Sequence, residues 1–163
     1  MNQRTEEGMT PIVKTIGRLV INFIILFGVY IILYGHITPG GGFPGGVIVA
    51  TAFILIMLAY GRETALRKFG DMTASLLDNF GALSFLIIGL LGFTGGYFFF
   101  NFISRGAPFD LFSAGIIPLS NIAIGLKVAA SLYAVFVALA IFGKILTRRP
   151  PAEEDDQTEG QSQ

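Results

Sequence analysis

Lys127 is the only Lys, Arg, Asp or Glu between Leu111 and Gly143, a stretch that is otherwise apolar or uncharged. If such a stretch crosses a bilayer, a charge near its centre costs about 2.5–3.5 kcal/mol, and such residues often line a polar path or pair with another group. Asn121 precedes Lys127, and Ser131 follows it by one helical turn. These three residues are candidates for a proton or cation path, or for a subunit interface.

Snorkelling is the alternative reading of Lys127. If the helix enters the membrane at Asn121, six residues at 1.5 Å each place Lys127 only about 9 Å deep. A lysine stem can reach the outer interface from that depth. The residues alone leave both readings open.

A second candidate is the glycine-rich segment 34–46, which joins two apolar stretches. It contains His36, the single histidine of the chain and a further candidate for the ion path or a subunit interface. Pro39 ends the preceding helix, and Pro44 suits the first turn of the next. The motif loop consists of Thr38, Pro39, Gly40, Gly41, Gly42, Phe43, Gly45 and Gly46.

The free amides at the helix start after this loop could bind an anion or a carbonyl group, and a tight external turn is the alternative. The loop is not a P-loop, because the Gly-Lys-Ser/Thr ending is missing. Irregular backbone at membrane depth must be covered by protein or water. We therefore expect the loop to be buried against a partner subunit.

The composition excludes several classes of chemistry. The chain has no cysteine, which excludes disulfides, thiolate metal sites and cysteine nucleophiles, and one histidine excludes a two-histidine metal site. Eleven basic and eleven acidic residues balance, so no basic surface for nucleic acid is expected. We expect no catalytic residue, metal or cofactor in this chain.

The elements that carry these residues are membrane-spanning helices. Hydrophobic residues make up 53% of the chain and charged residues 13%, compared with about 25% charged residues in soluble domains. Four stretches are apolar and long enough to cross a bilayer as helices, at about 12–34, 43–60, 80–102 and 121–146. The sequence predicts an all-α integral membrane domain over residues 1–149, with Asp78 and Asn79 as the N-cap of the third helix. Residues 150–163 are predicted to form a disordered acidic tail.

Basic residues flank these stretches on alternate sides. Arg4, Lys14 and Arg18 lie before or just inside the start of the first stretch, and three more Lys or Arg residues lie between the second and third. Lys144, Arg148 and Arg149 lie at or after the end of the fourth, whereas the loop after residue 34 has no Lys or Arg and the loop after the third stretch has only Arg105. Cytoplasmic loops carry the excess of Lys and Arg. Both termini are therefore predicted to lie in the cytoplasm, with the motif loop outside and the protein in the cytoplasmic membrane.

The segment Tyr-Gly-His-Ile-Thr-Pro-Gly-Gly-Gly-Phe-Pro-Gly-Gly at 34–46 resembles the hallmark of the MnhB family. This family comprises the B subunit of Mrp-type multisubunit sodium/proton antiporters, and it supplies a small membrane subunit of archaeal membrane-bound hydrogenase and sulfane reductase complexes. The resemblance extends over about residues 10–146 and includes segments 112–118 and 121–128. Segment 121–128 is more similar to the hydrogenase-associated and archaeal branch than to the bacterial antiporter branch.

The resemblance implies an accessory membrane subunit of a cation/proton antiporter-type complex that contributes to sodium/proton translocation. One alternative is a membrane subunit of an energy-converting oxidoreductase, of the hydrogenase or sulfane reductase type, whose catalytic centres lie on other chains. A second alternative is a structural helix bundle that positions its neighbours. In each case the chain is not an enzyme by itself. The implied partners are other membrane subunits and the lipid bilayer, with sodium ions and protons passing through the complex.

Overall fold

The computed structural model describes residues 11–61, 65–67, 69–103 and 114–147, and within these ranges it contains helices and no strand. The long helices are α1 (Pro11–Tyr34), α2 (Gly42–Tyr60), α4 (Asp71–Leu91) and α5 (Ile117–Thr147), and a short 3-10 helix, η1 (Gly92–Gly95), extends α4. Each of the four long helices carries an apolar stretch long enough to cross a membrane. The predicted all-α fold with four membrane-spanning helices is confirmed.

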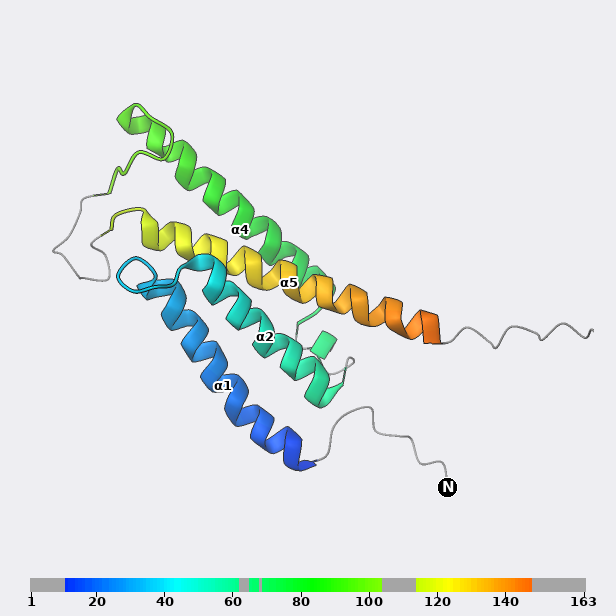
Figure 1. The fold of residues 1–163 in the computed structure, drawn as a ribbon. Helices are drawn as coiled ribbons and strands as arrows, with labels where there is room; N and C mark the ends of the chain where they lie inside the picture. Colours follow the sequence, from blue (N-terminus) through cyan, green and yellow to red (C-terminus); the bar gives the residue numbers. More distant parts are fainter. Residues whose placement is uncertain (1–10, 62–64, 68, 104–113, 148–163) are drawn as a thin grey trace, which may run out of the picture.

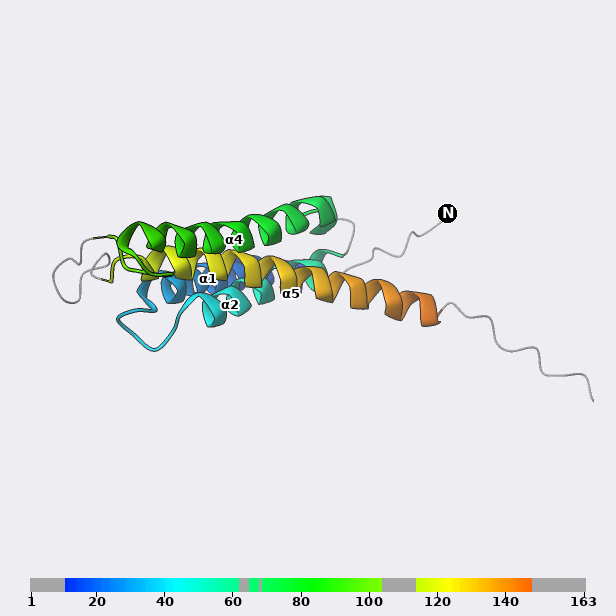
Figure 2. The same cartoon turned by 90° about the horizontal axis from the view of Figure 1, so that it is seen from above.

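The four long helices run alternately up and down (Figure 1). α5 packs against α2 on one side and α4 on the other, and α1 packs mainly against α2. Figure 2 shows α5 between α4 and α2 when the bundle is viewed from above. We call the end where α1 begins and α5 ends the termini end, and the end that holds the turn between α1 and α2 the motif end.

Glycines in the motif bring the helix backbones close together. A Cβ at Gly46 would lie 2.7 Å from the carbonyl oxygen of Gly125 on α5, and one at Gly42 would collide with the carbonyl oxygen of Asn121. Gly45, on another face of α2, lies against Gly28 of α1 in the same way. Small residues are the usual means of helix association in lipid. These glycines therefore join α1, α2 and α5 within one chain.

Two apolar clusters hold the two ends of the bundle. At the termini end, the Tyr133 side chain is 1% exposed, stacks edge-on against the rings of Phe53 and Phe69, and donates a hydrogen bond to the Phe69 carbonyl oxygen at 3.1 Å. At the motif end, Ile88 of α4 and Ala123 of α5 belong to a second cluster. Apolar side chains therefore join α4 and α5 near the motif end.

The predicted bounds of the third span, 80–102, are wrong at both ends. α4 begins at Asp71, so Asp78 lies inside the helix, where Lys127 of α5 compensates its charge. Beyond η1 the chain reverses at Gly96, where φ is 99°, and the Phe99 amide donates back to the Gly89 carbonyl oxygen at 3.1 Å. The apolar residues that follow Gly96 therefore do not continue the helix.

The other bounds differ less. α5 begins at Ile117, whereas the predicted span began at 121. The predicted acidic tail at 150–163 lies outside the described residues.

Candidate functional site: an ion pair between two spanning helices

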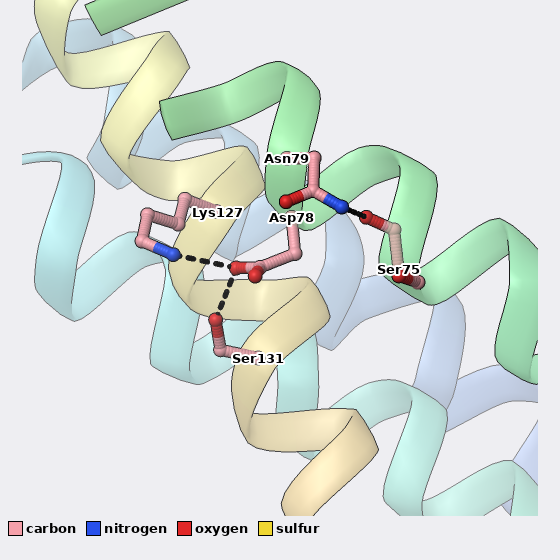
Figure 3. Close-up of polar contacts among 5 residues, drawn as sticks. All are labelled: Ser75, Asp78, Asn79, Lys127 and Ser131. Atoms are coloured by element: carbon pink, nitrogen blue, oxygen red, sulfur yellow. Dashed lines mark hydrogen bonds and ion pairs between the residues drawn. The ribbon is translucent and has the colours of Figure 1, made fainter. Parts of the chain in front are cut away.

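Lys127 forms an ion pair with Asp78. The Lys127 Nζ donates to the Asp78 Oδ1 at 2.7 Å, and the Ser131 hydroxyl donates a hydrogen bond to the same oxygen. Figure 3 shows the two side chains of α5 reaching the carboxylate of α4 from adjacent turns. Both hydrogen bonds end on Oδ1, and no described residue donates to Oδ2 in the contacts found for this carboxylate. One carboxylate oxygen is therefore left for another donor.

The pair lies inside the apolar spans of both helices. Lys127 is ten residues from the start of α5, about 15 Å along the helix axis, and Asp78 is seven residues from the start of the antiparallel α4, about 10 Å from the opposite end. The hydrocarbon core of a bilayer is about 30 Å thick. The two charges therefore meet inside the apolar layer, on the side of its midplane that is closer to the termini end.

The pair is only partly covered by its own chain. The side chain of Lys127 is 45% exposed and that of Asp78 is 31% exposed. Hydrocarbon cannot solvate an exposed charge at this depth. The open face of the pair consequently requires water or protein from another subunit.

A groove of about 290 Å³ between α4 and α5 leads away from the carboxylate. Most of its lining is small or apolar, and its polar groups are two serines and Asp78 itself. The lining residues are Ala74, Ser75, Asp78, Ser131, Ala134, Val137, Ala138 and Ile141.

Of the predicted site residues, the structure brings Lys127 and Ser131 together and leaves two others elsewhere. Asn121 lies at the motif end, where its backbone packs against Gly42. His36 is half-buried in the turn that follows α1, also at the motif end. The described geometry therefore contains a cluster around Asp78 rather than a single polar path through all four residues.

The N-cap prediction for Asp78 and Asn79 is wrong, because α4 starts seven residues earlier, with Gly70 at the N-cap position. The Asn79 side chain donates to the Ser75 carbonyl oxygen of its own helix at 2.9 Å (Figure 3). One signal for the pair was present in the sequence. Asp78 and Lys127 carry opposite charges and border or interrupt the apolar stretches of two consecutive spans.

The motif loop closes the end of α1 with its own polar groups. The Thr38 amide and hydroxyl both donate to the Tyr34 carbonyl oxygen, at 2.9 and 3.1 Å, and the Gly41 amide donates to the Ile31 carbonyl oxygen at 3.3 Å. Pro39, Gly40 and Phe43 stay exposed, with Phe43 at 64%. Burial of the loop against a partner subunit remains a prediction that concerns these exposed residues.

The fold and the ion pair define a multi-pass membrane protein with charged groups inside its membrane-spanning part. A family model described as a domain related to the MnhB subunit of the Na+/H+ antiporter matches residues 12–134. The chain belongs to the MnhB family.

Individual relatives agree with this assignment. An uncharacterized protein of Methanocaldococcus jannaschii is 40% identical over 152 residues, which cover 89% of this chain and 58% of that protein. A Staphylococcus aureus protein with the provisional name antiporter subunit mnhB2 is 44% identical over 57 residues, 35% of this chain and 40% of its own length. The chain thus spans about three fifths or less of these relatives.

A solved structure is similar over most of the chain. The structure is that of the membrane-bound sulfane sulfur reductase, described as an archaeal respiratory membrane complex. One of its chains matches with a TM-score of 0.66 and 36% identity, over 83% of this chain and 59% of that chain.

Proposed function

We propose that this protein is a membrane subunit of a multisubunit ion-translocating complex of the sodium/proton antiporter type, and that it contributes to sodium/proton translocation in the cytoplasmic membrane. The observation that carries the proposal is the Asp78–Lys127 pair inside the apolar spans of two helices. Ionisable residues at such depth commonly belong to ion pathways or proton relays. The family and the antiporter name of one relative support the same function.

Neighbouring subunits complete the path in this proposal. Between residues 79 and 104, and between 111 and 143, the sequence holds no carboxylate, so Asp78 has no acidic successor on α4 or α5 along the membrane normal. A cation that reached Asp78 would need further groups on another chain. The exposed side of the pair is where such a chain would lie.

The second candidate function is a membrane subunit of an energy-converting oxidoreductase. The similarity to a chain of the sulfane sulfur reductase complex favours it, since that match covers 83% of this chain. In this case the catalytic centres lie on other chains, and the subunit described here serves the ion-translocating part. Co-purification separates the two candidates, because an oxidoreductase complex would bring redox-active subunits with it.

The test is ion coupling in the whole complex. Lys127→Met and Asp78→Asn are introduced separately, assembly is checked by pull-down, and sodium-dependent proton movement is measured in inverted membrane vesicles. We expect assembled complexes with coupling reduced by about tenfold or more, the loss that corresponds to about 1.4 kcal/mol of activation free energy. Asn79→Ala is the matched control, because Asn79 neighbours Asp78 but bonds only its own helix among the contacts found for it.

Wild-type coupling in fully assembled Lys127→Met and Asp78→Asn complexes would contradict the proposal. The chain would then be a structural bundle that positions its neighbours.

A further inference from the structure

The groove beside the ion pair spans the distance from the pair to one edge of the apolar region. On α5 it runs from Ser131 to Ile141, ten residues or about 15 Å, and the apolar span of α5 ends at Gly143. On α4 it begins at Ala74, next to the start of the apolar span at Met72. The groove therefore connects the Asp78 carboxylate with the membrane surface at the termini end.

The α4–α5 contact is closed on the other side of the pair. A Cβ at Gly81 would lie 2.8 Å from both the Ala123 carbonyl oxygen and the backbone nitrogen of Lys127. Further toward the motif end lies a separate cavity of about 590 Å³, lined by Phe85 of α4 and by Ile117 and Ser120 of α5 among others, and neither Asp78 nor Lys127 belongs to its lining. The close backbone contact at Gly81 lies between this cavity and the groove that contains Asp78.

We propose that the groove is a one-sided water path through which protons reach Asp78 from the termini end. The inference rests on the proposed function and adds to it the direction of access and the species carried. In the proton step, a hydronium ion in the groove transfers its proton to Asp78 Oδ2, which leaves water and a neutral carboxylic acid. Lys127 keeps its positive charge, and the reverse step returns the proton to the groove.

The groove suits protons better than sodium ions. Lys127 already holds the carboxylate at 2.7 Å, so a sodium ion on Oδ2 would lie close to a second positive charge in a medium of low dielectric constant, whereas a transferred proton leaves a neutral acid. Apart from Asp78, the side-chain oxygens of the lining come only from Ser75 and Ser131. Water needs only two to four polar partners and can also bond to other waters.

The groove is not enclosed by this chain, and the ion pair beside it is partly exposed. In the complex, a neighbouring subunit would supply the missing wall. The path is therefore tested in the assembled complex and not in the isolated chain.

The test uses thiol accessibility, for which the native chain has no cysteine of its own. Ala138→Cys places a thiol in the groove, and Leu139→Cys places one at almost the same depth on the outer surface, where Leu139 is 64% exposed. Ser75→Cys and Leu76→Cys form a second matched pair on α4, of which Ser75→Cys is nearly isosteric. Membrane-impermeant thiol reagents are added from one side of sealed vesicles, and the tagged subunit is then isolated.

We expect the two groove cysteines to react about tenfold faster or more than their partners, because the thiolate that reacts forms only in a polar surrounding. The reaction should occur from one side only, opposite to the side that labels Thr38→Cys at the motif end. Using Thr38→Cys as the reference makes the result independent of the assigned membrane orientation. In addition, the groove cysteines should react as fast in the Asp78→Asn background, because the substitution removes the proton acceptor and not the water.

Equal, slow labelling of all four cysteines would overturn the water path, even if Asp78→Asn abolished ion coupling and so supported the proposed function. Labelling of the groove from both sides would overturn one-sided access. Fast labelling of the groove together with wild-type coupling in Asp78→Asn would mean that water enters but that Asp78 carries no proton, which also contradicts the inference.

Discussion

Gly81 on α4 lies directly against the backbone of Lys127 on α5, and a Cβ at position 81 would be 2.8 Å from the backbone nitrogen of Lys127. Asp78, the partner of the Lys127 ammonium group, precedes Gly81 by one helical turn. The glycine therefore sets the separation of the two helices at the level of the ion pair. The nearest atoms belong mainly to the α5 backbone, which cannot adopt another rotamer as a flexible side chain can. A side chain at position 81 would therefore push α4 and α5 apart.

Gly81→Ala should weaken the bundle and ion coupling together. Overpacking of this kind typically costs about 1–3 kcal/mol, although alanine is otherwise the better helix former. Gly143→Ala is the control, because a Cβ at Gly143 meets no atom within 4 Å. Thermal unfolding of the purified complex measures the difference, and equal midpoints for the two variants would show that the α4–α5 contact is looser than described.

Lys127→Met and Asp78→Leu should each lower the amount of subunit in the membrane, and the double variant should recover it. Each single change leaves one charge without its partner inside the apolar layer, at a cost of up to about 2.5–3.5 kcal/mol, the value that insertion scales give for the helix centre. The double change removes both charges and both costs. Quantitative immunoblots of membranes carrying the three variants provide the measurement, with ion coupling expected to stay low in the double variant.

If Lys127→Met alone accumulated as well as the double variant, Asp78 would not depend on Lys127 for its place in the membrane. The ion pair would then have no role in holding α4 and α5.

Much of this arrangement could be predicted from the sequence, because uninterrupted apolar runs identify α1, α2 and α5 without tertiary information. The predicted start of the third span lies too late in the sequence, because Asp78 interrupts the apolar run of α4. A charge in a candidate span is normally taken as the boundary of that span. The compensation of that charge comes from Lys127, 49 residues later, so it is a tertiary property. The aromatic residues after Gly96 are apolar enough to continue a span, but the glycine takes a left-handed conformation and turns the chain back.

The sequence indicates the two members of the candidate site that lie on α5, but it does not indicate their partner on α4. Lys127 and Ser131 share a face of one helix, which their spacing reveals, and the structure places them on the same carboxylate. The groove toward Ile141 depends on how two helices separate, and spacing within one helix does not describe that separation.

Tyr133→Phe should reduce stability by about 0.5–1.5 kcal/mol, the usual net contribution of one hydrogen bond. The variant keeps the ring that packs on Phe53 and Phe69 but removes the hydroxyl that donates to the Phe69 carbonyl oxygen. Thermal unfolding of the complex again gives the measurement. A change as large as that of Tyr133→Ala, for which about 3–5 kcal/mol is typical of a large buried ring, would mean that the hydroxyl carries the interaction and the ring does not.

An impermeant thiol reagent should label Thr38→Cys from outside intact cells and should not label Gln161→Cys. The expectation follows from the Lys and Arg residues that flank the spans on one side. It also agrees with the fold, in which α1 begins and α5 ends at the same end of the bundle (Figures 1 and 2). Permeabilised cells are the control, where both positions should react, and external labelling of position 161 would invert the assigned orientation.

The distance in sequence between Asp78 and Lys127 has a consequence for biogenesis. Ribosomes add about 5–20 residues per second, so the 49 residues between the two take about 2 to 10 seconds to synthesise. During that interval the Asp78 carboxylate has no counter-charge from Lys127, and α4 is the least apolar of the four spans. We therefore expect α4 to stay at the translocon until α5 has been synthesised. Release of α4 into lipid is therefore expected to be coupled to the arrival of α5, and a nascent chain truncated before α5 should leave α4 at the membrane surface.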